Sequence, residues 1–369
     1  MLLKRSCGLA ALFLMIASAA PAKGLTDSYL ATIATAHGVA PLFSRKIRQM
    51  DVYHINLYRL IPSYGAVFLA SFWSHHPACV AKAPWGSFWA FGNRSHGSEI
   101  GNLSGKFLRP RRKFAWRMAL RLAGSWPIGT ASDRTLWLLF QSKSYSRLRL
   151  RIFSPHMRTQ VGVYTSPRAT YFGYSWTLVG RQAVFFVNTV GLRAKVCHVV
   201  VVDEKGQARA TDLTSKVGWA PYFLSSAGNL FSGVASGRGI VQKLVSFHVL
   251  PSGKVARVRT ERITSRHHRW LIVTAFTLLD QHTALASLKL RHGSGYSYEL
   301  ARISVASGRV EKSVPIPYPA LLVLRAKGVV YLVANRELVR AYTPALRLLG
   351  HYPPYSFVGG AAVASVPGR

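Results

Sequence analysis

Short apolar runs, each closed by a cluster of turn-forming residues, recur along this chain and constrain its fold more than any other feature. Between Trp270 and Val314, four such runs are separated by turns at Asp280–Thr283, His292–Gly295 and Ala306–Gly308. Runs of this kind, rich in β-branched and aromatic residues, are typical of strands joined by tight turns. The segment therefore predicts one unit of four antiparallel strands within about 45 residues.

The same unit recurs on both sides of this segment. Further copies cover Ser175–Asp212, Leu230–Val258 and Ala320–Gly350. The glycines of three closing turns, Gly206, Gly253 and Gly308, stand 47 and 55 residues apart. Four-stranded units of about 40–50 residues are the blades of β-propellers. The chain of 369 residues therefore predicts an all-β propeller of seven four-stranded blades, with six or eight blades as alternatives.

The two ends of the chain are expected to close the ring together. Ser356–Ala364 reads as one strand beyond the last full unit, and Val52–Leu60 and Ala66–Trp73 read as strands near the other end. A blade shared by these segments would hide the free strand edges. We expect a single propeller domain over residues 51–369. Residues 23–50 are expected to be irregular or to hold a short helix over Thr26–Thr35, capped at Thr26.

The first 22 residues have the pattern of a secretory signal peptide. Lys4 and Arg5 precede the apolar run Gly8–Ala17, and small residues follow up to Ala22. The run is short for a membrane span, so an uncleaved anchor is the less favoured interpretation. Since no later apolar run reaches about 18 residues, we expect no transmembrane segment after cleavage. The pattern predicts a periplasmic, extracellular or cell-surface location.

The charge of the chain is strongly unbalanced. There are 48 Lys and Arg residues against 12 Asp and Glu residues, a formal net charge of +36. So many like charges repel one another and weaken the folded state, so something must offset this repulsion. One is an anionic partner. The other is an acidic medium, in which a protein with few carboxylates has little carboxylate-linked stability to lose.

One basic cluster alternates with apolar residues. Arg147, Arg149 and Arg151 are separated by Leu148 and Leu150. On a strand, such an alternation places the arginines on one face and the apolar residues on the other. The arginine face is a candidate for binding phosphate or carboxylate groups, because guanidinium binds them through two hydrogen bonds. The favoured alternative is a strand whose charged face meets only water.

A second basic cluster contains aromatic residues. Its members are Arg109, Arg111, Arg112, Lys113, Phe114, Trp116, Arg117 and Arg121. Basic residues beside aromatic rings can bind anionic polymers. The alternative is a basic surface loop in a chain that is basic throughout. Nucleic acid is not the expected natural ligand, because an exported protein seldom meets it.

Catalytic, metal and cofactor motifs are missing from the sequence. The adjacent histidines of His267-His268 would point to opposite faces of a strand, so they suit no shared metal ion. The acids are scattered, and several, such as Asp203 and Asp280, fall in expected turns. We therefore expect no metal and no cofactor. Cys79 and Cys197 are left after removal of the signal, either as one disulfide or as two separate buried thiols.

The segment Ala301–Val310, a strand followed by Ala306-Ser307-Gly308 and a second strand, resembles the repeat edge of secreted bacterial β-propeller proteins. That group includes quinoprotein-like repeats. The resemblance covers residues 145–350 and implies the propeller architecture. Quinoprotein repeats usually carry Asp before this turn and Trp after it. Other residues stand there in this chain, so the resemblance implies no quinone site and transfers no functional residue.

These observations favour an exported, non-enzymatic propeller that binds an anionic or extended partner on one ring face. The partner classes are an anionic polymer, another envelope component or a protein. The first alternative is an extracytoplasmic lyase, hydrolase or oxidoreductase with its site in the central channel, which would need converging acids, histidines or arginines there. The second is an envelope protein whose charge reflects only an acidic medium.

Overall fold

The computed structural model describes most of the chain from residue 28 onward. The described residues are 28–36, 52–61, 65–74, 77–82, 87–94, 97–104, 116–120, 125–130, 135–141, 147–154, 160–166, 170–190, 195–217, 221–236, 241–266, 270–326, 328–334, 340–351 and 361–365. The signal-like segment and the basic residues 105–115 lie outside this set. Within it, no helix is long and apolar enough to cross a bilayer.

The strands form seven sheets of four strands each. Blade 1 contains β28 (Ala361–Ser365), β1 (Ser28–Ala36), β2 (Val52–Ile61) and β3 (Gly65–Ser74). Blade 2 contains β4 (Pro77–Lys82), β5 (Ser87–Arg94), β6 (Gly97–Ser104) and β7 (Trp116–Leu120). Blade 3 contains β8 (Ser125–Thr130), β9 (Leu136–Gln141), β10 (Leu148–Phe153) and β11 (Gln160–Thr165).

The remaining four sheets are consecutive in sequence. Blade 4 contains β12 (Thr170–Val179), β13 (Gln182–Val190), β14 (Lys195–Asp203) and β15 (Ala208–Asp212), followed by the one-turn helix α2 (Thr214–Val217). Blade 5 contains β16 (Phe223–Ala227), β17 (Leu230–Ser236), β18 (Gln242–Val249) and β19 (Val255–Arg262). Blade 6 contains β20 (Leu271–Leu278), β21 (Thr283–His292), β22 (Gly295–Ser304) and β23 (Val310–Ile316). Blade 7 contains β24 (Ala320–Ala326), β25 (Val329–Ala334), β26 (Arg340–Tyr342) and β27 (Leu348–His351).

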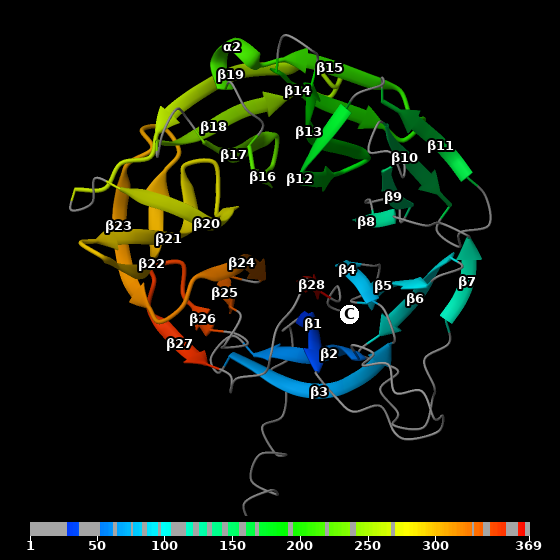
Figure 1. Ribbon diagram of the computed structural model, residues 1–369, viewed down its shortest axis with the longest axis horizontal. Helices are drawn as coiled ribbons and strands as arrows, with labels where there is room; N and C mark the ends of the chain where they lie inside the picture. The colour runs from blue at the N-terminus through cyan, green and yellow to red at the C-terminus, as the bar shows by residue number, and fades with distance from the viewer. Residues whose placement is uncertain are drawn as a thin grey trace, which may run out of the picture.

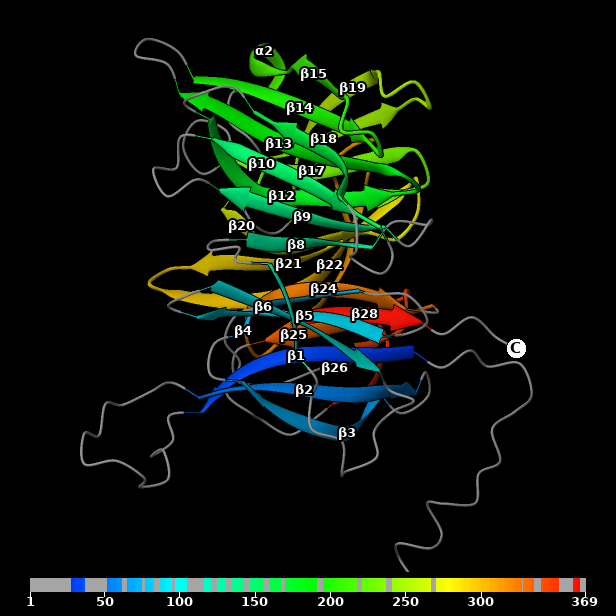
Figure 2. The same ribbon diagram turned by 90° about the vertical axis from the view of Figure 1, so that its right-hand side faces the viewer.

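The blades stand around a central channel, as Figure 1 shows. The inner strand of each blade borders the channel, and the fourth strand runs along the circumference. Neighbouring inner strands are in contact around the whole circle, including β24 with β28 and β28 with β4. Figure 2, a view at right angles, shows the strands of successive sheets stacked above one another. The predicted seven-bladed all-β propeller is therefore confirmed.

Both ends of the chain contribute to blade 1, as expected. β28 pairs antiparallel with β1, with Leu30 opposite Val363. The helix predicted for Thr26–Thr35 is wrong, because Ser28–Ala36 is the strand β1 and the propeller begins there rather than at residue 51. An isolated helix of that length is marginal in water. A strand held between β2 and β28 instead satisfies its backbone hydrogen-bonding groups on both sides.

The described core lies between the blades. Phe247 of blade 5 stacks on Phe231 of the same blade at 5.6 Å and meets Phe186 of blade 4 edge-on at 5.8 Å. All three side chains are almost fully buried. Comparable clusters join blades 3 and 4, blades 5 and 6, and blades 6 and 7. Burial of one such side chain contributes roughly 1.5–3 kcal/mol, so packing between neighbouring blades contributes to the stability of blades 3 to 7.

The recurring turn glycines connect each blade to the one before it. Gly206, Gly253 and Gly308 join the third and fourth strands of blades 4, 5 and 6, and all have positive φ (82°, 77° and 68°). A Cβ atom at Gly206 would overlap the carbonyl oxygen of Val163 in blade 3, and one at Gly308 would overlap that of Arg262 in blade 5. These two turns therefore need glycine both for conformation and for close approach.

The corresponding turn of blade 7 carries a leucine. Leu346 has φ 68° and donates its backbone N–H to the Thr343 carbonyl at 2.9 Å, as Gly206 does to Asp203 at 3.0 Å. Its side chain is buried beside Tyr342, and this burial offsets the cost of the left-handed backbone. Lys312 of blade 6 donates to the Ala345 carbonyl in the same turn at 3.0 Å. The blade-to-blade contact is thus kept without the glycine.

We predict that Gly308→Ala destabilises the protein more than Gly328→Ala does. Both glycines have positive φ (68° and 72°), but no atom lies within 4 Å of a Cβ at Gly328. The Gly328 variant should lose about 1–2 kcal/mol of unfolding free energy from backbone strain. The Gly308 variant should lose a further 1–3 kcal/mol from the clash with Arg262. Urea unfolding measures both losses, and equal losses would contradict the proposed role of this turn.

Candidate functional site

The inner strands that border the channel carry almost no charge. Over the seven inner strands, the only charged residues are Lys82 at the end of β4 and Arg325 near the end of β24. These strands contain no Asp, Glu or His residue. A hydrolase or lyase site built on them would therefore lack the paired carboxylates or the histidine that such chemistry uses.

Hydroxyl groups connect neighbouring inner strands instead. Thr177 Oγ1 of β12 lies 3.5 Å from Ser226 Oγ of β16, and Ser225 Oγ lies 3.2 Å from Thr277 Oγ1 of β20. Ser225 Oγ also accepts the backbone N–H of Leu278 at 2.9 Å. These contacts cross from blade 4 to blade 5 and from blade 5 to blade 6. These hydroxyls therefore connect neighbouring blades near the channel.

The predicted alternation at Arg147, Arg149 and Arg151 is present on β10. Leu148 and Leu150 are fully buried and pack against blade 4, whereas Arg147 and Arg149 are exposed and Arg151 is half-buried. Arg149 donates from Nε to Thr165 Oγ1 of β11 at 3.4 Å. The arginines thus occupy the face of blade 3 turned away from blade 4. Whether that face binds an anion stays a prediction.

Most of the second predicted cluster lies outside the described residues. Arg109, Arg111, Arg112, Lys113 and Phe114 precede β7, and Arg121 follows it, in parts of the chain that the structure does not describe. Trp116 and Arg117 are on β7, the outermost strand of blade 2, opposite Gly101 and Ile100 of β6. Only these two members are placed by the structure, both on blade 2, and the binding role of the cluster stays a prediction.

A third basic row, which the sequence analysis missed, runs along β19 and its continuation. It consists of Arg257, Arg259, Arg262 and Arg266, and we call it the β19 row. All four side chains are exposed. The alternation of Arg257 and Arg259 with Val258 is the same signal that singled out β10. This signal is present in the sequence itself.

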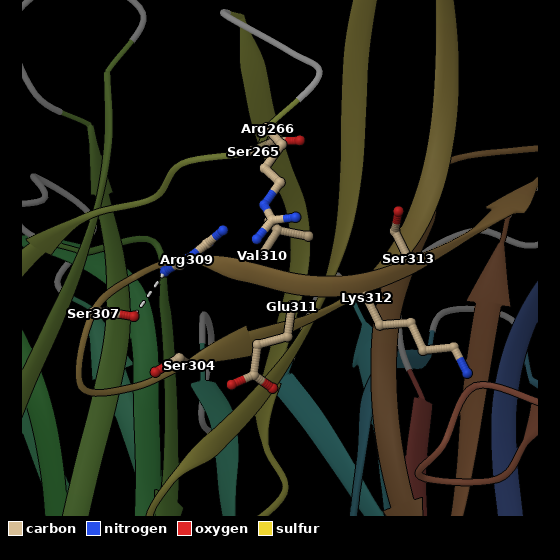
Figure 3. Close-up of a pocket in the computed structure, with 9 residues that line it drawn as sticks. All are labelled: Ser265, Arg266, Ser304, Ser307, Arg309, Val310, Glu311, Lys312 and Ser313. Carbon is tan, nitrogen blue, oxygen red and sulfur yellow. Dashed lines mark hydrogen bonds between the residues drawn. The ribbon is translucent and has the colours of Figure 1, made fainter.

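A hollow of about 520 Å³ lies at the end of the β19 row, between blades 5 and 6. Its lining consists of Ser265, Arg266, Ser304, Ser307, Arg309, Val310, Glu311, Lys312 and Ser313. Figure 3 shows the Arg266 and Arg309 side chains directed toward one another, while Glu311 points away from them. Among the features of the described residues, this hollow is the strongest candidate for a ligand site.

The acids Asp203, Asp212 and Asp280 support local backbone, as the sequence suggested for Asp203 and Asp280. Asp203 Oδ1 accepts the backbone N–H groups of Lys205 and Gln207 at 2.9 and 2.8 Å. Asp280 accepts two such bonds in its own turn, each 2.7 Å long. Among the described residues, no group of three His, Cys, Asp or Glu side chains is arranged to hold a metal ion.

Cys197 is a free, buried thiol on β14 of blade 4. Cys79 lies on β4 of blade 2, and blade 3 stands between the two blades. A disulfide requires Cα atoms about 4.4–6.8 Å apart, which strands of non-neighbouring blades do not provide. No Cys79–Cys197 disulfide is formed, so the alternative of a separate buried thiol holds for Cys197. Burial, with a smaller contribution from Asp212, raises the pKa of this thiol to about 12.

Comparison with solved structures identifies the fold. The chain resembles a protein from Lactobacillus plantarum (TM-score 0.51, 10% identity, covering 92% of this chain and 99% of that one). It also resembles a mutant apocarotenoid oxygenase of Synechocystis (0.54, 10%, 92% and 93%) and the β-propeller domain of the Pyrococcus furiosus Trilobed protease, described as having an open velcro topology (0.52, 13%, 89% and 91%). No protein-family model and no curated protein sequence matches. At these identities the likeness establishes a β-propeller fold and nothing about activity.

We predict that Asp212 stabilises the fold at neutral pH but not in strong acid. Hydrogen bonds from the hydroxyl and backbone N–H of Thr214, 2.6 and 2.7 Å long, lower the pKa of Asp212. A lowered folded-state pKa contributes stability above the unfolded pKa, and this stability is lost as the pH falls through the folded value. Asp212→Asn should therefore unfold at lower urea than the parent at pH 7 and at nearly the same urea at pH 2. An undiminished difference at pH 2 would contradict this role.

Proposed function

We propose that this chain is an exported, non-enzymatic β-propeller that binds an extended anionic partner, such as an acidic envelope polysaccharide. Two features of the sequence support the proposal: the signal-like pattern of residues 1–22 and the net charge of +36. A positive surface of this strength raises the association rate of anionic partners. The resemblance of Ala301–Val310 to exported bacterial propeller repeats is consistent with it.

The observation that carries the proposal is the distribution of charge within the blades. Three exposed arginines of the β19 row lie on the outer strand β19, where Arg259 and Arg262 point to opposite faces, and the fourth, Arg266, follows the strand. On β10, Arg149 adds an exposed guanidinium on the third strand of blade 3. The only charged residues on the inner strands are Lys82 and Arg325. We therefore place the binding surface on the outer strands, which modifies the expectation that the partner would bind one ring face.

The rival proposal, an enzyme acting in the central channel, has less support. It needs acids, histidines or arginines that converge at the channel. The inner strands supply no acid and no histidine. Hydroxyls on β12, β16 and β20 are occupied in contacts between the blades. The arrangement on these strands favours a scaffold whose outer surface recognises its partner.

The test uses dextran sulfate as the anionic probe and uncharged dextran of the same length as its control. We predict that the mature chain binds only the sulfated polymer and that log K falls steeply with log salt concentration, because ions are released from the polymer. The variant R257Q/R259Q/R262Q should bind more weakly and with a shallower salt dependence. Calorimetry at several salt concentrations measures both quantities.

A matched variant distinguishes binding by the β19 row from attraction by the net charge of the chain. R181Q/R291Q/R325Q removes three positive charges from exposed positions on three different blades. It should retain nearly the binding of the parent chain. Equal weakening by both triple variants would show that overall charge alone attracts the polymer. Failure of the parent chain to bind would overturn the proposed function.

A further inference from the structure

The hollow between blades 5 and 6 is built on backbone that connects the two blades. Thr264 donates its backbone N–H to the Gly308 carbonyl at 3.1 Å and accepts the N–H of Val310 at 2.9 Å. Thr264 and Arg309 are thus partners in a parallel bridge. Arg266 follows Thr264 by two residues, and Arg309 lies within the bridge. The backbone positions of both arginines are therefore fixed relative to each other.

The charges of Arg266 and Arg309 are not neutralised within the described part of the chain. Neither guanidinium makes a hydrogen bond or an ion pair with a described residue. Both side chains are exposed and point toward one another across the hollow (Figure 3). Two like charges held in this way repel each other. An anion placed between them offsets this repulsion and is attracted by both guanidinium groups.

The other two charged side chains that line the hollow interact with residues outside it. Lys312 donates from Nζ to the Ala345 carbonyl in blade 7 at 3.0 Å. Glu311 lies 3.9 Å from Arg302, measured between Oε2 and Nη2, and points away from the two arginines. Glu311 therefore does not serve as the counter-ion of Arg266 or Arg309. What remains facing the hollow between them is a pair of cations.

Serine hydroxyls complete the lining. The hydroxyls of Ser265, Ser304 and Ser313 make no hydrogen bond with a described residue, so each keeps a donor for a ligand oxygen. Ser307 instead accepts the backbone N–H of Arg309 at 3.4 Å. Two guanidinium groups from different directions, with hydroxyl donors beside them, suit an anion that has three or more accessible oxygens. A carboxylate offers only two.

We infer that Arg266 and Arg309 form a clamp for a tetrahedral oxyanion, a phosphate or sulfate group. The clamp rests on the proposed function, because such a group would be carried as an ester by the extended anionic partner. The β19 row leads directly to this hollow, so a polymer lying along the row would place one of its charged groups between the two arginines. Each guanidinium can then bind two of its oxygens at once.

The test measures small anions first. Inorganic phosphate, inorganic sulfate, glycerol phosphate and acetate are titrated into the mature chain, with arginine Nε–H signals observed by NMR. We expect phosphate and sulfate to shift the Arg266 and Arg309 signals in a saturable way, and acetate to bind at least about tenfold more weakly. Glycerol phosphate is a phosphate ester, so comparing its binding with that of inorganic phosphate shows whether the site accepts an ester as well as the free ion. Binding of free phosphate with exclusion of the ester would overturn the inference.

Three variants complete the test. R266Q/R309Q should weaken phosphate and sulfate binding by about tenfold or more, and R266K/R309K should recover only part of it, because lysine lacks the planar fork. R291Q/R325Q, which removes two positive charges from exposed positions outside the hollow on blades 6 and 7, should bind phosphate like the parent chain. Thermal unfolding confirms that each variant is folded. Unchanged phosphate binding in R266Q/R309Q would overturn the clamp.

The two proposals fail in different ways. If the parent chain binds dextran sulfate but neither phosphate nor sulfate, the clamp is wrong and the proposed function stands. If phosphate binds at Arg266 and Arg309 but dextran sulfate does not bind, the clamp stands as a small-anion site and the extended partner is wrong.

Discussion

Closure of the ring is the constraint on which the rest of this structure depends. In the described core, blades 3 to 7 bury apolar side chains against their neighbours, as Phe186 and Phe247 do across blades 4 and 5. An open ring would leave two blade faces exposed to water, at a cost proportional to their apolar area. Pairing of β28 with β1 prevents this by placing both chain ends in one sheet.

The radial arrangement of the blades also separates the contacts between blades near the axis from the charged side chains on the outer strands. Near the axis, strands of neighbouring blades are close, and small hydroxyl side chains such as Ser225 and Thr277 bridge them. Toward the circumference the blades diverge, and the outer strands gain a solvated face where arginines are accommodated without being buried. A chain with an extreme positive charge can therefore keep inner strands whose only charged residues are Lys82 and Arg325. The β19 row lies at the circumference, and this is why we propose the binding surface there.

Much of the fold was predictable because it depends on local patterns, whereas the candidate site was not. The spacing of Gly206, Gly253 and Gly308 marked the blades, because these turns occupy corresponding positions in consecutive blades. β1 was expected to be irregular or a short helix, because one of its two partner strands, β28, is at the other end of the sequence. The hollow was missed for a similar reason, since Arg266, in the connection after β19, and Arg309, in the turn before β23, are far apart in sequence and are brought near each other by the bridge between Thr264 and Arg309.

The most direct test of the account is the stability of a chain that ends at residue 360 and so lacks β28. We predict that its thermal unfolding midpoint falls well below that of the full chain. Hydrogen exchange should become faster in β1, which loses its partner, and in β4 and β24, which contact β28 on either side. An unchanged midpoint with unchanged exchange in these strands would show that blade stability does not depend on closure of the ring.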